Sequence, residues 1–166
     1  MLLVLLTLLP GLFLYIHFFG LGILLNVLIA TITAIFAEFI ILKIRKLPAK
    51  IFLTDYTAVV TAWLLALSIP SIAPWWITVL GTLFAIVVAK HFYGGIGSNL
   101  FNPAMIGYAI LLISFPAVMT KWQNPSHIND MGLSLSIFLG GVDNYDAIAS
   151  ATPMDYLKTE LLQGKN

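Results

Sequence analysis

The chain contains no cysteine among its 166 residues, and only 9% of them are charged. Without thiolates it can form neither disulfides nor cysteine-ligated zinc or iron–sulfur sites. Soluble domains carry roughly 25% charged residues, so this composition excludes an ordinary soluble domain. The net charge of +1 offers no basic surface for nucleic acid. The chain is instead 60% hydrophobic with a mean hydropathy of +1.00, which indicates a polytopic membrane protein.

Histidine is scarce as well, with only His17, His91 and His127 in the sequence. No two of them are spaced as HxxH or HxxxH, so we expect no metal or haem site from this chain alone. With thiolate ligands absent as well, any redox centre bound by the chain is expected to be organic.

The first 37 residues, Met1 to Ala37, contain no charged side chain. As one helix they would extend for about 55 Å, nearly twice the ~30 Å hydrocarbon core of a bilayer. The run must therefore fold back, and residues 17–22 supply interfacial aromatics and two glycines for the turn. The predicted spans are Leu2 to Ile16 and Leu21 to Leu42. Since the run lacks a basic n-region, we expect a missing cytoplasmic leader before Met1 and not a cleaved signal peptide.

A basic segment follows the second span, with Lys43, Arg45, Lys46 and Lys50 within eight residues. Loops rich in lysine and arginine stay on the cytoplasmic side of a membrane. Beyond this segment the sequence predicts three more apolar spans, from Tyr56 to Ile69, from Trp76 to Ala89 and from Pro103 to Phe115.

Counting the spans from the basic segment assigns the remaining charged residues to one or the other side of the membrane. Lys90, directly after the fourth span, joins the cytoplasmic cations, and Thr152 falls on the periplasmic face. The predicted fold is an all-α membrane protein with about five transmembrane helices in residues 1–119. Residues 120–166 are predicted to form a polar outer segment, which holds five of the seven acids and ends with the start of a helix from Met154 to Leu162.

Glu38 and Asp55 are the only acids near the membrane interior. Ionisable residues inside a membrane suggest an ion pathway. A structural role is favoured here, because Thr54 and Asp55 are predicted to cap the third span and Glu38 is close enough to a helix end to reach the interface. The other polar residues of the spans are predicted to hydrogen-bond between helices: Asn26, Thr31 and Thr33.

A glycine-rich loop covers Gly94 to Asn99. It lacks the lysine and the serine or threonine of a P-loop, so a tight turn between packed helices is predicted. Asn102 and Pro103 then serve as the predicted N-cap and first residue of the fifth span.

The segment that contains this loop resembles a known family, the RnfD membrane proteins of the Rnf ion-translocating electron-transport complex. A more distant likeness is to the NqrB proteins of the Na⁺-pumping NADH:quinone reductase. The resemblance extends from Met1 to about Asp155, and its most specific block is Tyr93-Gly94-Gly95-Ile96-Gly97-Ser98-Asn99-Leu100-Phe101-Asn102-Pro103-Ala104-Met105-Ile106-Gly107-Tyr108, followed by Leu111-Leu112-Ile113-Ser114-Phe115-Pro116.

The resemblance implies a covalent flavin. In that family a threonine carries FMN through a phosphoester, within an Asp-x-x-Ser/Thr-x-Ala-Thr pattern that a flavin transferase reads. Asp146, Ala151 and Thr152 match this pattern, whereas Ala147 replaces the usual glycine and Ala149 the usual serine or threonine. Taken without the resemblance, Thr152 is more simply the N-cap of the following helix.

The resemblance also implies a function and partners. Its members are electron-relaying subunits of the bacterial inner membrane, with two related sets of helices, of which this chain would supply the first and the flavin segment. The implied partners are the other subunits of an Rnf-type complex, among them a second flavoprotein and iron–sulfur subunits, together with membrane lipid. This chain has no dinucleotide fingerprint and no complete active site. A cofactor-free transporter or channel half is the competing hypothesis.

Overall fold

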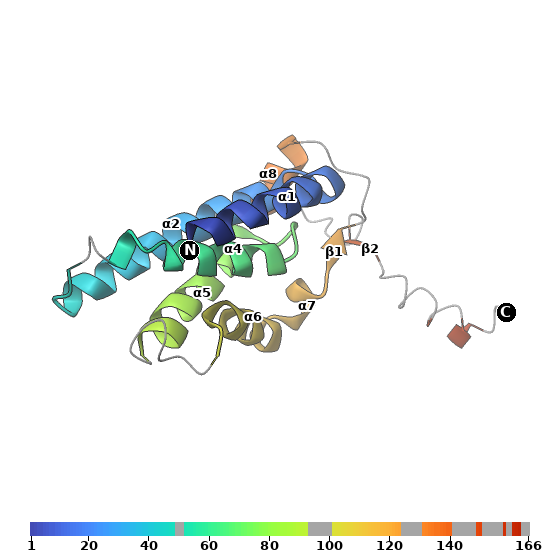
Figure 1. Cartoon of the computed structure of the whole chain (residues 1–166). Coiled ribbons are helices and arrows are strands. Elements are labelled where there is room, and N and C mark those ends of the chain that lie inside the picture. Colours follow the sequence, from blue (N-terminus) through green and yellow to red (C-terminus); the bar gives the residue numbers. More distant parts are fainter. Residues whose placement is uncertain are drawn as a thin grey trace.

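The computed structural model describes residues 1–48, 52–92, 101–123, 131–140, 149–150, 158 and 161–163. Helices dominate these residues. Two strands of two residues each pair as a small antiparallel ladder. In chain order the elements are α1 (Leu2–Phe19), α2 (Gly22–Ile44), α4 (Thr57–Ser68), α5 (Trp75–Leu83), the π-helix η1 (Phe84–His91), α6 (Pro103–Ser114), α7 (Pro116–Met119), β1 (Trp122–Gln123), α8 (Met131–Phe138) and β2 (Ala149–Ser150) (Figure 1).

All five predicted spans are helical, which confirms the expected all-α membrane architecture. Within the described part of the chain, α1 and α2 are long and apolar enough to cross a bilayer on their own. The other three spans are shorter apolar helices, Thr57–Ser68, Trp75–His91 and Pro103–Ser114.

The turn between α1 and α2 uses its two glycines for different purposes. Gly20 has a φ of 75°, a left-handed conformation that glycine adopts without steric cost. Gly22 allows α2 to approach the backbone after α4, because a Cβ at this position would lie 2.6 Å from the Ser71 carbonyl oxygen. The predicted break in the charge-free run is therefore confirmed, although α1 continues to Phe19, three residues beyond the predicted end.

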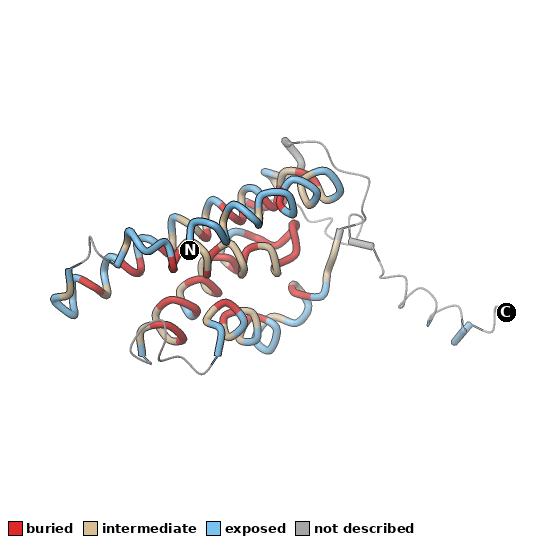
Figure 2. The backbone as a smooth tube through the Cα atoms, in the orientation of Figure 1, coloured by how far each residue is buried: buried red, intermediate tan, exposed pale blue. Residues whose placement is uncertain are grey.

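The apolar surface of the first helix faces outward. Leu12 is the only buried residue in α1, whereas side chains such as Leu3 and Phe13 are more than 70% exposed. Figure 2 shows this contrast between the exposed α1 and the buried turns of α4 and α5. In water such a surface would be unfavourable, and in a bilayer it contacts lipid tails or neighbouring helices.

The helices pack around α4, whose buried side chains contribute to two adjoining clusters. Ala62 and Ala66 face α2, and Leu65 packs with Ile77 of α5 and Leu111 of α6. The side chains against α2 are mostly alanine, so these two helices approach closely, as is common for helix pairs in membranes.

The α6 helix crosses α5 and η1 at two glycines. A Cβ on Gly107 would lie 2.7 Å from the Gly81 carbonyl oxygen and 3.0 Å from the Cβ of Ala85. The Asn102 side chain accepts a hydrogen bond of 3.0 Å from the amide of Ala104, and Pro103 is the first helical residue, so the predicted cap of α6 is confirmed.

We expect Gly107→Ala to lower the free energy of unfolding by about 1–3 kcal/mol, because the added methyl group forces two backbones apart. The matched control is Gly11→Ala, also inside a helix, where a Cβ would meet nothing within 4 Å. That substitution is expected to leave stability equal or raise it by up to about 1 kcal/mol. Unfolding in mixed detergent micelles measures both values. Equal changes in the free energy of unfolding for the two substitutions would contradict the close approach of α6 to α5 and η1.

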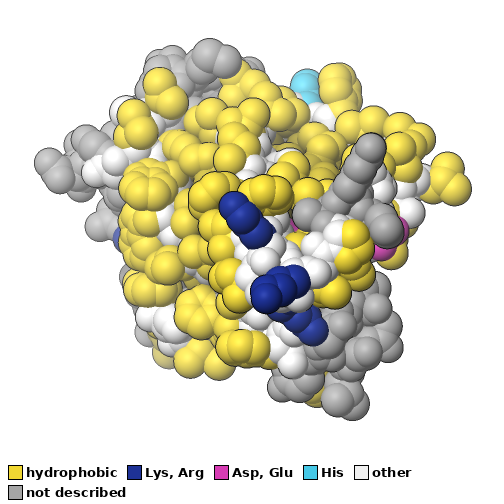
Figure 3. Space-filling view, turned by 90° about the vertical axis from the view of Figure 1, so that its left-hand side faces the viewer, with side chains coloured by type: hydrophobic (Ala, Val, Ile, Leu, Met, Phe, Trp, Pro, Cys, Tyr) yellow, Lys and Arg dark blue, Asp and Glu magenta, His cyan; other side chains and the backbone are white. Residues whose placement is uncertain are grey.

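The two ends of the helical bundle differ in composition. At one end, where α2 finishes, Lys43, Arg45 and Lys46 are exposed, and we call this the basic end. Figure 3 views this end and shows lysine and arginine side chains gathered within a largely apolar surface. The opposite end carries the α1–α2 turn, α7 and the β1–β2 ladder (Figure 1). Lysine and arginine gathered at one end of a bundle of apolar helices are typical of a protein that crosses a bilayer.

Two structural features differ from the sequence predictions. Asp55 does not cap the third span, because α4 begins at Thr57 after Tyr56, whose left-handed conformation (φ 58°) takes the N-cap position. The outer segment after residue 120 is not uniformly polar either, since α8 packs against α2 with Ile137 and Phe138 buried. Within the predicted terminal helix, Lys158, Leu161 and Leu162 are helical.

Candidate functional site

The candidate flavin attachment residue, Thr152, lies outside the described residues, as do Asp146, Ala147 and Ala151. The segment that leads to it is described at two residues. β2 pairs with β1 in antiparallel register, with Trp122 opposite Ser150 and Gln123 opposite Ala149. The backbone two residues before Thr152 is therefore attached to the end of the bundle opposite the basic end.

A cavity of about 330 Å³ lies beside this ladder. Trp76 of α5 and Lys121, which directly precedes β1, both line it, together with Ile72, Pro74, Ala117, Val118 and Gly140. The Trp76 ring is held in place by an edge-on contact with Phe115, at 5.1 Å between ring centroids and an interplanar angle of 81°. The cavity therefore has an apolar wall, one aromatic face and one cationic side chain.

Hydrogen bonds connect side chains of α2 to neighbouring segments near this end. Asn26 of α2 donates a hydrogen bond from Nδ2 to the Pro70 carbonyl oxygen (3.3 Å) and accepts one at Oδ1 from the Thr78 hydroxyl (2.8 Å). Thr31 accepts a bond from the Trp63 indole at 3.2 Å. The predicted interhelical roles of Asn26 and Thr31 are confirmed. Within the described residues Thr33 shows no such bond.

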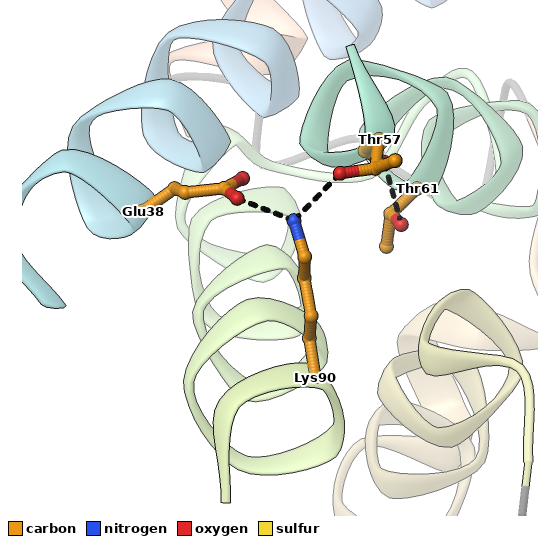
Figure 4. A network of polar contacts seen from close by, with 4 residues as sticks. All are labelled: Glu38, Thr57, Thr61 and Lys90. Carbon is orange, nitrogen blue, oxygen red and sulfur yellow. Dashed lines mark hydrogen bonds and ion pairs between the residues drawn. The ribbon is translucent and has the colours of Figure 1, made fainter. Parts of the chain in front are cut away.

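A second polar site lies inside the bundle, toward the basic end. The Lys90 ammonium group donates to Glu38 Oε1 at 2.5 Å and to the Thr57 hydroxyl at 2.9 Å. Three elements meet here, because Glu38 is on α2, Lys90 on η1 and Thr57 at the start of α4 (Figure 4). Thr61 extends the cluster, donating from its hydroxyl to the Thr57 carbonyl oxygen at 3.0 Å.

This cluster corrects one prediction. Glu38 does not reach the interface, since it is 1% exposed and turns inward to Lys90. Lys90, which the sequence assigns to the cytoplasmic cations, is 3% exposed and paired with Glu38. Pairing offsets the cost of burying both charges, which is large for either group alone. The sequence signal for the pair was one acid and one base, each within an otherwise apolar run.

The remaining candidates are located as follows. Asp55 is exposed and His17 is exposed at the end of α1. His91 ends η1, and its carbonyl oxygen accepts a bond of 3.4 Å from Arg45 Nη1, which links the ends of α2 and η1. His127, Lys50 and the glycine-rich loop from Gly94 to Asn99 lie outside the described residues.

The sequence is similar to known proteins along its whole length. Residues 1–166 match the family described as the NQR2, RnfD, RnfE family. A protein from Yersinia pseudotuberculosis serotype O:1b (strain IP 31758), named as a subunit of the ion-translocating oxidoreductase complex, is 47% identical over 97% of this chain and 50% of the relative. A protein of the same name from Aeromonas salmonicida (strain A449) is 48% identical, over 99% of this chain and 51% of the relative. The chain thus spans about half the length of the curated relatives it matches.

Proposed function

This chain belongs to the NQR2, RnfD, RnfE family, and on that basis we propose that it is part of a membrane subunit of a redox-driven, ion-translocating complex. Its own contribution is to hold FMN, joined by a phosphoester to Thr152, at the end of the bundle opposite the basic end. Electron entry and exit take place on partner subunits, which include iron–sulfur proteins and a second flavoprotein. The names of the relatives, which describe a subunit of an ion-translocating oxidoreductase complex, support the coarser part of this proposal.

The observation that carries the flavin proposal is the β1–β2 ladder beside the cavity. Ser150 is paired with Trp122, and Lys121, the neighbour of Trp122, lines the cavity. Two extended residues reach at most about 7 Å, which is the farthest that the Cα of Thr152 can lie from the Cα of Ser150. A cofactor attached there would be within reach of the cavity and also of water, which can solvate its phosphate.

The residues that line the cavity fit the chemistry of a flavin. Its volume of about 330 Å³ lies within the range of roughly 300–1,000 Å³ found for small-molecule pockets. Trp76 offers a flat aromatic surface to a planar ring, and Lys121 brings a positive charge to a group that carries an anionic phosphate. When bound, FMN supplies the ability to accept and pass on electrons, while the protein supplies position and electrostatic environment.

The direct test is whether the protein carries a covalent flavin. The full-length protein is produced together with its flavin transferase, denatured, and examined by in-gel fluorescence and intact mass. We expect fluorescence at the position of the polypeptide and the added mass of one FMN group. A denatured protein without flavin, from membranes that still show ion flux, would favour the competing hypothesis of a cofactor-free transporter half, for which the buried Glu38–Lys90 pair is the supporting feature.

The proposal also predicts sidedness. Because the chain has no cysteine, a single introduced cysteine is a unique label site. We expect Asn144→Cys to react with a membrane-impermeant maleimide from the periplasmic side of intact cells. The control Lys46→Cys, on the exposed basic end, should react only in inverted vesicles. Labelling of both positions from the same side would overturn the proposed topology.

A further inference from the structure

One face of α2 is apolar and exposed along most of its length. The buried residues of this helix lie on its other face, toward α4 and α5. The exposed side chains recur every three or four residues and therefore share one side of the helix. We call this surface the α2 stripe, which consists of Leu28, Ile32, Phe36, Phe39 and Ile40. The described helices leave it uncovered, so in a membrane it contacts lipid or another protein.

The α2 stripe leads to a group of cations. Lys43 follows Ile40 by three residues, so it continues the same face of the helix. Arg45 and Lys46 come next among the charged residues, and all three cationic side chains are exposed. From Ile32 to Lys43 the helix rises about 16 Å, which is close to the ~15 Å that one leaflet contributes to the hydrocarbon core. A phospholipid with its phosphate beside Lys43 would therefore have its acyl chains along the stripe.

The backbone at the end of α2 satisfies its own carbonyl groups. The Leu47 amide donates to the Leu42 carbonyl oxygen at 2.9 Å, and the Lys46 amide donates to that of Lys43 at 3.2 Å. This arrangement gives Lys46 a left-handed conformation with a φ of 55°, in which glycine is the favoured residue. The lysine side chains are therefore not needed to cap these carbonyls, and at position 46 a lysine is present where glycine would fit the backbone better.

Within the described residues, no carboxylate pairs with the cations at the end of α2. Glu38, the one acid of this helix, is held by Lys90 inside the bundle and leaves their charge uncompensated. The surface around the lysine and arginine side chains is largely apolar (Figure 3). A soluble acidic protein would match only the charge of this surface. An anionic phospholipid matches both features, because it carries a phosphate and acyl chains in one molecule.

From this charge complementarity and length we propose that the α2 stripe and the cations at its end form a binding site for an anionic phospholipid, in the leaflet on the side of the basic end. The phosphate is bound by Lys43, Arg45 and Lys46, and the acyl chains pack against Phe36 and Ile40. The lipid holds the basic end of the bundle at the membrane surface. This site is separate from the proposed flavin site, which lies at the opposite end of the bundle.

Photocross-linking identifies what contacts the stripe. The full-length protein in its assembled complex carries p-benzoylphenylalanine in place of Phe36, in liposomes of phosphatidylethanolamine with phosphatidylglycerol as the minor component. Mass spectrometry identifies the cross-linked lipids. We expect phosphatidylglycerol adducts enriched about fivefold or more over its bulk share, because each lysine or arginine near the membrane surface favours anionic lipid by about that factor. The matched control replaces Phe13 of α1, which is also exposed and lies toward the α1–α2 turn. Its adducts should follow the bulk composition.

The charge dependence separates recognition of the headgroup from mere contact with lipid. Lys43→Gln/Lys46→Gln removes two exposed cations and retains Arg45, whose Nη1 donates to the His91 carbonyl oxygen. We expect the enrichment at position 36 to fall toward the control value in this variant, and also at an ionic strength of about 1 M, where the Debye length is ~3 Å. Adducts in the bulk lipid ratio, cross-links to protein in place of lipid, or an enrichment that either change leaves intact would overturn the proposal.

Discussion

Thr152→Val should yield a protein that carries no covalent flavin. Valine has nearly the shape of threonine but lacks the hydroxyl oxygen that a phosphoester requires, so the loss is expected to be complete. Pro153 is kept, and with it the extended backbone that the residue before a proline prefers. In-gel fluorescence and intact mass of the denatured protein, produced together with its flavin transferase, measure the outcome. Electron transfer by the complex should fall with the loss of the cofactor.

The matched control is Ser150→Ala, which removes the neighbouring hydroxyl. Ser150 pairs with Trp122 through its backbone, so alanine leaves the β1–β2 ladder intact and flavin loading should remain at the wild-type level. This pair of variants also decides which hydroxyl is used in a segment that carries Ala149 where serine or threonine is usual. Residual flavin in Thr152→Val, or its loss in Ser150→Ala, would assign the attachment to another residue.

Lys90→Met should strongly destabilise the helical bundle. It leaves the Glu38 carboxylate buried without a counter-charge, and removal of one partner of such a pair costs about 3–5 kcal/mol. Methionine keeps most of the volume and flexibility of the lysine side chain, so the loss reflects the charge and its hydrogen bonds and not a cavity. The free energy of unfolding in mixed detergent micelles provides the measurement.

Two controls accompany this prediction. Lys46→Met removes an exposed cation at the basic end and should change stability by no more than about 0.5 kcal/mol. Glu38→Gln/Lys90→Met removes both charges and should recover most of the stability lost in Lys90→Met, because no unpaired charge remains. If Lys90→Met were as stable as Lys46→Met, the Glu38–Lys90 ion pair would not be formed in the folded protein.

The predictions from sequence succeeded where local composition decides the structure. The α1–α2 turn followed from two glycines in a charge-free run too long for one bilayer crossing, and the cap of α6 followed from Asn102 and Pro103. The cap of α4 was predicted wrongly at Asp55, because Tyr56 adopts a left-handed conformation that residue type alone does not indicate. The α8 helix was missed because its eight residues are too short to give a periodic signal.

The sequence by itself determined that the chain is a bundle of apolar helices with one basic end, since hydrocarbon admits only segments that satisfy their own backbone hydrogen bonds. The tertiary structure alone decided that Glu38 and Lys90, 52 residues apart, form one buried pair. It alone decided, too, that the strand leading to Thr152 lies beside a cavity lined by Trp76 and Lys121. Both depend on contacts between distant segments, and these form only when the helices pack.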